Sequence, residues 1–288
     1  MRKVIPVVNN YDESLKHADF GKLQLFLQVS FESIAFCLYD SNVQKFLSLE
    51  AHEFELSNDD EAVTLIKEVV EDHLIKRQKF GSVYVLYESN HSALVPAPLF
   101  DESETDAITD FSYTVSPGME TFFEKIENLD TYNLYTVSKA LRGTIDALFS
   151  DYNSVSHSKI LIESLLINYK NANSQKRIFV NIRKSNLDIA VLDGRKLLYF
   201  NTFACLAKED YVYFIIFVMD RLNLSTEETE LKLSGYIDHN SKTFDTIYKY
   251  IKHTSFHNRP NSTAYSYVFN DVPEHYFFSL LNIPSCVL

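Results

Sequence analysis

The stretch NLDIAVLDGRKLLYFNTF, residues 186–203, decides the fold, because it describes a β-hairpin that recurs in altered form elsewhere in the chain. Apolar residues alternate with other residues on both sides of Asp193-Gly194, a pair that favours a tight two-residue turn. A third short apolar run, RIFVNI, precedes the hairpin at residues 177–182. Together these runs predict three consecutive antiparallel strands.

A similar series lies near the N-terminus, in LQLFLQVSFESIAFCLYDSNVQKFLSL, residues 23–49. If Ile34 is aligned with Ile189, an offset of 155 residues, the apolar alternation of the two series falls into register. A helical pattern follows each series, at residues 57–75 and 208–224, and one more strand follows each helix, at residues 82–88 and 228–237. We therefore predict one α/β module that occurs twice. We expect the second helix, which holds the longest apolar run, YVYFIIFVM, to be the more thoroughly buried of the two.

The chain divides at NANSQ, residues 171–175, a short polar segment that is followed at once by a new apolar run. We predict a first module over residues 1–173 and a second over residues 174–288. The first is the longer, and it contains a segment with three of the seven prolines and a dense group of acidic residues. We interpret this segment, about residues 91–131, as an insertion.

Composition limits the classes of partner. The 288 residues are 46% hydrophobic and 23% charged, a balance typical of folded proteins, and the formal net charge is −12. This charge repels nucleic acid and anionic membrane surfaces, so we expect no nucleic-acid partner. Apolar runs fall far short of the roughly 20 residues that cross a bilayer, which argues against direct membrane insertion. Three cysteines without a pairing pattern, and no secretion signal, predict a cytoplasmic protein.

The order of three antiparallel strands, a helix, a parallel strand and a further helix resembles the ribonuclease-H-like module, and two such modules in tandem form the actin-like ATPase fold. With LVPAPLFDE, YNLYTVS, HSKILIESLL and YSYVFNDVPEHYFFSLL at their relative positions, the sequence resembles a bacterial family called domain of unknown function 3822. That family resembles in outline the cytoplasmic scaffold proteins of type IV pili and type II secretion. The resemblance implies an α/β protein with the actin-like fold and a mixed sheet in each module.

Active members of the actin-like superfamily hold phosphate at the first hairpin turn of each module, in a loop with glycine, because backbone N–H groups must approach the phosphate closely. Neither turn here, at residues 29–33 and 183–188, contains a glycine, and Glu32 adds a negative charge. Gly235 stands where the adenosine loop would be, and a strand end or bulge explains it equally well. We therefore expect no cofactor. If ATP binding were retained, the residues around the cleft would be Ser30, Ser33, Lys184, Ser185, Asp188 and Gly235.

The sequence gives little support for a nuclease, a metal site or a reactive cysteine. A two-metal nuclease needs a carboxylate in the first strand of the module, and neither LQLFLQV nor RIFVNI has one. His253 and His257 are four residues apart, a spacing that would place both rings on one face of a helix, but no third metal ligand lies nearby in the sequence. Cys37 and Cys205 fall in predicted strands and are interpreted as core residues. We expect no catalytic residue and no metal.

Two functions remain. The first is a non-catalytic binding or scaffold protein that contacts a protein partner, for which an exposed share of the 22 phenylalanines and 18 tyrosines would form a surface. The alternative is a degenerate ATP-binding protein or ATPase that uses the cleft between the modules. The sequence identifies neither the partner nor the oligomeric state.

Overall fold

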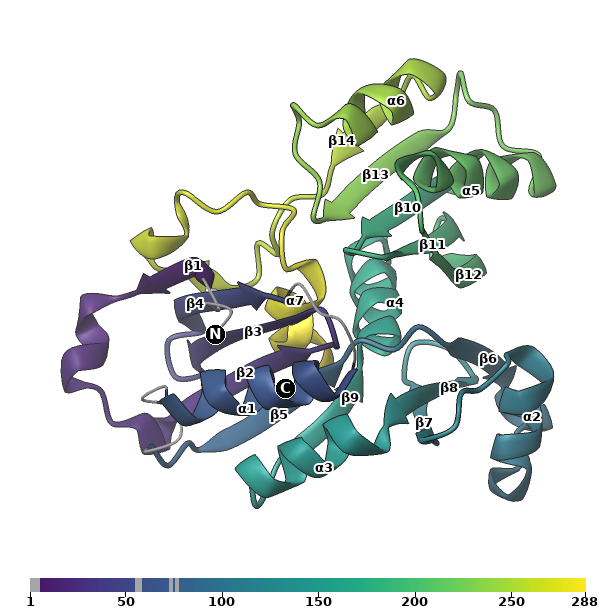
Figure 1. Ribbon diagram of the computed structural model, residues 1–288. Helices are drawn as coiled ribbons and strands as arrows, with labels where there is room; N and C mark the ends of the chain where they lie inside the picture. The colour runs from purple at the N-terminus through teal and green to yellow at the C-terminus, as the bar shows by residue number, and fades with distance from the viewer. Residues whose placement is uncertain (1–5, 55–58, 73–74, 76–77) are drawn as a thin grey trace.

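The computed structural model describes residues 6–54, 59–72, 75 and 78–288. Within these residues the chain forms three β-sheets that are connected and covered by helices (Figure 1). Two of the sheets have the strand order of the predicted modules, and the third is a smaller sheet between them in the sequence.

The largest sheet belongs to the first module. Its strands lie in the order β1-β4-β3-β2-β5-β9, and β15 also pairs with β4. The bounds are Pro6–Tyr11 (β1), Leu23–Val29 (β2), Ser33–Asp40 (β3), Lys45–Glu53 (β4), Ser82–Tyr87 (β5), Asn153–Ser156 (β9) and Ala264–Tyr265 (β15). Strands β2, β3 and β4 form an antiparallel series, whereas β5 runs parallel to β2 and β9 parallel to β5.

The second module repeats this arrangement in the order β12-β11-β10-β13-β14. The bounds are Lys176–Ile182 (β10), Asn186–Asp193 (β11), Lys196–Ala204 (β12), Glu230–Gly235 (β13) and Thr254–Phe256 (β14). Strands β10, β11 and β12 are an antiparallel series, β13 runs parallel to β10, and β14 runs parallel to β13. The prediction of two α/β modules, each with a mixed sheet, is confirmed.

The pairing of the strands corrects the alignment of the two copies. Val29 pairs with Ile34 across the first hairpin turn, and Ile182 pairs with Leu187 across the second. Because each pair closes its turn, equivalent residues of the hairpins are 153 positions apart, and the predicted offset of 155 is wrong. Side chains in a strand alternate with a period of two, so a slip of two residues leaves the apolar pattern unchanged.

Helices cover both faces of both large sheets. Helices α1 and α3 pack on one face of the first sheet and α7 on the other, while α5 and α6 pack on one face of the second sheet and α4 on the other. The bounds are Asp59–Asp72 (α1), Lys139–Leu148 (α3), His157–Asn168 (α4), Lys208–Arg221 (α5), Lys242–Tyr250 (α6) and Phe278–Val287 (α7). The ends predicted for α1 at residues 57–58 and 73–74 lie outside the described residues.

The two modules exchange a helix. α4 follows the last strand of the first sheet, yet its Leu161 and Leu165 pack with Phe179 of the second sheet. α7 lies at the C-terminal end of the second module, yet its Leu280 packs with Phe26 of the first sheet. The two helices also contact each other between the sheets (Figure 1). The interface between the modules is therefore part of both cores.

Helix α5 is less buried than expected. Its Tyr211 and Ile215 face the second sheet, but Tyr213 and Phe217 on the opposite face are exposed. One face is sufficient to cover the sheet, so the rest of the run YVYFIIFVM points outward. Helix α1 also buries one face, with Ala62, Ile66, Val69 and Val70, so over their described residues α5 is not the more thoroughly buried of the two. No helix in the described part of the chain has the length and apolarity that crossing a membrane requires.

The small third sheet has the order β6-β8-β7 and carries α2. The bounds are Ser92–Pro96 (β6), Thr105–Ser112 (α2), Met119–Ile126 (β7) and Thr131–Ser138 (β8). The fully buried Asn133 on β8 accepts a hydrogen bond from Ser92 Oγ at 2.6 Å and donates to Ser156 Oγ and Ser158 Oγ at 2.9 and 3.0 Å. These bonds fasten the small sheet to the start of α4.

Candidate functional site

The candidate site is the cleft between the two modules, where their first hairpin turns lie. The turn at residues 30–32 joins β2 to β3, and the turn at residues 183–185 joins β10 to β11. The parallel strands β5 and β13 end beside these turns. Ligands of open α/β sheets bind at the carboxyl ends of such strands, so a ligand of this fold would be expected here.

Ser30 and Ser33 use their hydroxyl groups for hydrogen bonds within and beside the first turn. Ser30 Oγ accepts hydrogen bonds from the backbone N–H groups of Glu32 and Ser33 at 3.1 and 3.0 Å. Ser30 Oγ and Ser33 Oγ also lie 3.1 Å apart, and both residues are buried. The N–H groups that would face a phosphate are therefore bound by a side chain of the same turn.

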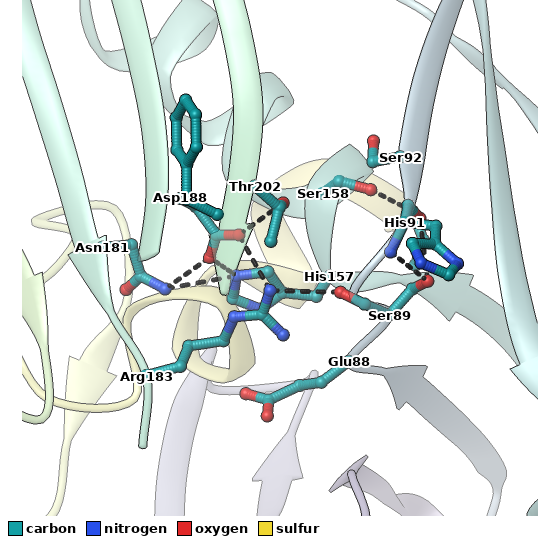
Figure 2. Close-up of polar contacts among 12 residues, drawn as sticks. Glu88, Ser89, His91, Ser92, His157, Ser158, Asn181, Arg183, Asp188 and Thr202 are labelled. Atoms are coloured by element: carbon teal, nitrogen blue, oxygen red, sulfur yellow. Dashed lines mark hydrogen bonds and ion pairs between the residues drawn. The ribbon is translucent and has the colours of Figure 1, made fainter. Parts of the chain in front are cut away.

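Hydrogen bonds cross from the second turn to the first module. They join Ser185 Oγ to the Glu32 carboxylate, Lys184 Nζ to the Phe54 carbonyl at 2.7 Å, and Arg183 Nη2 to the Ser89 carbonyl at 3.1 Å. The last of these is visible in Figure 2. Each is a contact between the side chain of a turn residue in the second module and a group of the first, so together they hold the two turns against each other.

Asp188 lies in a row of polar side chains that crosses the second sheet (Figure 2). Its cross-strand neighbour Asn181 donates to Asp188 Oδ2 at 3.0 Å, and its other neighbour, Thr202, donates to Oδ1 at 2.8 Å. Ser234 on β13 extends the row by donating to Asn181 Oδ1 at 3.0 Å. All four side chains are buried, and these bonds satisfy polar groups that would otherwise be costly to bury.

Two further groups face the Asp188 carboxylate. Arg183 Nη2 lies 3.0 Å from Oδ1, and His157 Nε2, from the first residue of α4, lies 2.9 Å from Oδ2. Burial acts to raise the pKa of Asp188, but the attraction of Arg183 and His157 outweighs it and holds this pKa well below its usual range. Asp188 is therefore ionised at neutral pH, and its charge is paired inside the protein.

Gly235 has a packing role in the cleft. It is the last residue of β13, its φ is +85°, and a Cβ atom at this position would lie 2.1 Å from the Ile182 carbonyl oxygen. The same oxygen accepts a hydrogen bond from the Tyr236 N–H at 2.8 Å. A glycine is required because the backbones of β10 and β13 approach closely at a left-handed turn of the chain.

One cavity between the modules has a volume of about 10 Å³. Four polar atoms of its lining residues have no hydrogen-bond partner among the described residues: Gln28 Oε1, His157 Nδ1, Arg183 Nε and Ser279 Oγ. This mixture of donors and acceptors, in a space of this size, matches one water molecule. Ligand pockets measure roughly 300–1,000 Å³, so a nucleotide does not fit this cavity. A second cavity, of about 320 Å³, lies beside the first turn and is lined by Ser30, Phe31, Glu88, His91 and Ser138 among other residues.

The profile of the family "Protein of unknown function (DUF3822)" matches residues 12–254, which is most of the chain. The chain belongs to the DUF3822 family. The family resemblance inferred from the sequence is thereby confirmed. No protein among the curated sequences matches this DUF3822 chain.

Solved structures identify the fold of this DUF3822 protein. A Bacteroides thetaiotaomicron protein "with actin-like ATPase fold and unknown function" aligns with a TM-score of 0.75 at 19% identity, over 86% of this chain and 95% of that one. The "PilM-PilN type IV pilus biogenesis complex" aligns with a TM-score of 0.61 at 12% identity, over 90% of this chain and 96% of that one. The predicted actin-like ATPase fold is confirmed; identities this low establish the fold alone.

The structure brings the six residues of the ATP-binding alternative to one cleft. Ser30 lies in the first turn and Ser33 begins β3. Lys184 and Ser185 lie in the second turn, Asp188 in the polar row and Gly235 at the end of β13. Sequence reasoning missed His157 and Arg183, which pair with Asp188. Ser156 caps α4 and so marks His157 as the start of a helix, but no local pattern shows that this helix faces the second sheet.

The histidine pair of the sequence is not a helical pair. His253 follows α6 and His257 follows β14, so the prediction that both rings share one helix face is wrong. His257 packs against the rings of Phe179 and Phe278, and burial lowers its pKa to about 4. Across the described residues, no group of three or more histidine, cysteine or acidic side chains is placed to hold a metal ion.

Cys37 on β3 and Cys205 directly after β12 are both buried in the core, so the core prediction holds while the strand position predicted for Cys205 is wrong. Burial raises the pKa of Cys37 well above its ordinary value and raises the pKa of Cys205 to about 12. Both thiols are therefore protonated at neutral pH, and a protonated thiol is a poor nucleophile.

Proposed function

We propose that this protein is a non-catalytic member of the actin-like fold that acts in the cytoplasm by binding another protein. The observation that carries the proposal is the closed cleft between the modules. The turns that would hold phosphate are joined by the protein's own side chains, and the cavity lined by His157, Arg183 and Gly235 measures about 10 Å³. The actin-like fold is kept, whereas side chains of the second turn bond to the first module where the two turns meet.

The chemistry of the first turn also disfavours a phosphate. The N–H groups of Glu32 and Ser33 donate to Ser30 Oγ, so they are not available to phosphate oxygens. The Glu32 carboxylate points across the cleft to Ser185, where it would repel a polyanion. A phosphate would have to displace both interactions.

Two observations support a protein partner. The PilM–PilN structure is a complex of type IV pilus biogenesis, so one protein with a similar fold takes part in a protein assembly. In this chain, aromatic side chains are exposed on α5 and α6, among them Tyr213, Phe217 and Tyr250. Contiguous apolar surface of this kind is typical of protein-binding sites.

The alternative is a degenerate ATP-binding protein or ATPase that uses Ser30, Ser33, Lys184, Ser185, Asp188 and Gly235. It has one feature in its favour, since the cationic side chains of Arg183 and Lys184 lie at the second turn. It requires the modules to separate, because the bonds of Lys184 and Ser185 to the first module occupy the cleft.

Thermal unfolding with magnesium ATP separates the two functions. A ligand present at 100 times its dissociation constant adds about 2.7 kcal/mol to the free energy of unfolding, which would raise Tm by several degrees. We expect the Tm of the purified protein to stay unchanged with magnesium ATP or ADP, and a protein to co-purify with it in a fixed ratio from the native cells. A saturable rise in Tm that is abolished by Lys184→Ala would support the alternative and contradict the proposal.

A further inference from the structure

A groove between α5 and α6 lies on the outer side of the second module. Its volume is about 540 Å³, and its lining includes Glu209, Tyr213, Phe217, Asp220 and Tyr250. Tyr213, Phe217 and Tyr250 are 61%, 36% and 49% exposed. The two helices cover the face of the five-stranded sheet opposite α4, so the groove lies outside the contact between the modules (Figure 1).

The duplicated fold provides an internal comparison for this surface. Helix α1 has the same place in the first module that α5 has in the second, and the fully buried Ile66 and Ile215 are their equivalent inward residues. With these two aligned, the positions of the exposed Tyr213 and Phe217 are held in α1 by Thr64 and Glu68, which are also exposed. Since the module folds with a polar outer face on α1, packing within the module does not require the aromatic face of α5.

The charges along the groove favour a cationic partner. Glu209 and Asp220 lie near the two ends of α5, and both carboxylates line the groove. At the rim, Arg221 lies 5.3 Å from the centre of the Phe217 ring and Lys249 lies 5.9 Å from that of Tyr250. These two cations belong to the rim, whereas the described lining of the groove contains two carboxylates and no basic side chain. The complement of this surface is an apolar segment with basic residues at its ends.

We propose that the groove binds an amphipathic helix of a protein partner, with Leu, Ile, Met or Phe on its apolar face and Lys or Arg near its ends. This inference rests on the proposed function, because it places the docking surface of a protein-binding scaffold. α5 has 14 residues, and at a rise of about 1.5 Å per residue a partner helix of similar length would span the groove.

A variant that gives α5 the outer face of α1 tests the proposal. It carries Tyr213→Thr and Phe217→Glu, and it is expected to fold because α1 tolerates these residues at equivalent positions. The probe is a phage-displayed library of random 16-residue peptides. Wild-type protein should select peptides with apolar residues at helical spacing and an excess of Lys and Arg, and synthetic copies should bind the variant at least tenfold more weakly. Phe111→Glu, at a 93% exposed position on α2, is the control and should bind like wild type.

Several outcomes would overturn this inference. Selected peptides that bind the variant as tightly as wild type would place the binding surface elsewhere, and would leave a protein-binding function intact. An absence of selected peptides, or selection of acidic ones, would contradict the proposed partner chemistry. A wild-type dimer that dissociates in the variant, measured by sedimentation, would make a second copy the occupant. The magnesium ATP melt tests the proposed function separately.

Discussion

Gly235 is a residue at which a single missing Cβ atom permits the close contact of two strands. A side chain there would meet the Ile182 carbonyl at 2.1 Å and would also force an L-residue to φ +85°. We expect Gly235→Ala to lower the free energy of unfolding by about 3 kcal/mol or more, because both the clash and the strained backbone act on the folded state. Urea-induced unfolding measures this change.

Gly143 provides the matched control. It lies within α3, and a Cβ atom there would meet nothing within 4 Å. Gly143→Ala should therefore raise the free energy of unfolding by roughly 0.5–1 kcal/mol, because alanine favours the helix. Equal effects of the two substitutions would show that the close approach at Gly235 has been misassigned.

The pairing of Asp188 also gives a prediction at a single residue. Asp188→Asn leaves Arg183 buried without its counter-charge, so we expect a loss of about 3–5 kcal/mol in the free energy of unfolding at pH 7. The pKa of Asp188 is lower in the folded state than its unfolded value of about 3.9, so its contribution is present above that pH and is lost as the pH falls. The difference between wild type and variant, measured by urea unfolding from pH 7 to pH 3, should therefore shrink below about pH 4.

Asp110→Asn, at an exposed position on α2, is the control for this measurement. It should change the free energy of unfolding by less than about 0.5 kcal/mol at either pH. A difference between Asp188→Asn and wild type that grows on acidification would contradict the assignment of Asp188 as an ionised, paired carboxylate.

At the scale of elements, the sequence predicts the kind and order of strands well and their alignment less well. The alternation in RIFVNI and LQLFLQV identifies strands, but a period of two cannot distinguish an offset of 153 from one of 155. Likewise, the apolar run of α5 predicts a helix but not that its Tyr213 and Phe217 face outward. A local pattern shows how apolar residues are spaced, but which face of a helix packs against the sheet depends on the rest of the fold.

In the candidate site, too, the sequence predicts local features but not contacts between distant segments. The two turns were predicted because hairpins are local, and Ser30 and Ser185 were found there. The pairing of Asp188 with His157 was not predicted, because it depends on α4 crossing from the first module to the second sheet. Contacts between segments that are 31 residues apart in the sequence have no local pattern that would reveal them.

The packing of helix α7 against the first sheet leads to a prediction about a whole element. Leu280 and Ile283 on α7 are fully buried and pack against Phe26 and Cys37 of the first sheet. Leu280→Ala should lower the free energy of unfolding by about 2–5 kcal/mol and reduce the hydrogen-exchange protection of β2 and β3. Leu288→Ala, 59% exposed after the end of the same helix, should leave both unchanged. Loss of protection confined to the second sheet would contradict the exchange of helices.

At the scale of the whole molecule, the exchange of α4 and α7 makes the modules interdependent. In each large sheet one face is covered by a helix of the other module: α7 covers the first sheet and α4 covers the second. Polar contacts add to this dependence, since Lys184 and Ser185 bond to the first module. We therefore expect the protein to unfold as one cooperative unit, although its sequence divides into two repeats.

A fragment of residues 1–173 tests this expectation. It ends before the second sheet, so it lacks α7 and leaves the face of Phe26 and Cys37 uncovered, and α4 has no second sheet to pack against. We expect the isolated fragment to lack near-ultraviolet circular dichroism, to bind the dye ANS and to unfold without a cooperative transition, because these are properties of a chain without fixed packing. Addition of a fragment of residues 174–288 should restore the near-ultraviolet signal and a cooperative melt. If residues 1–173 alone unfold cooperatively with the stability of the full chain, the first module is independent of α7, and the core described for the interface does not stabilise the protein.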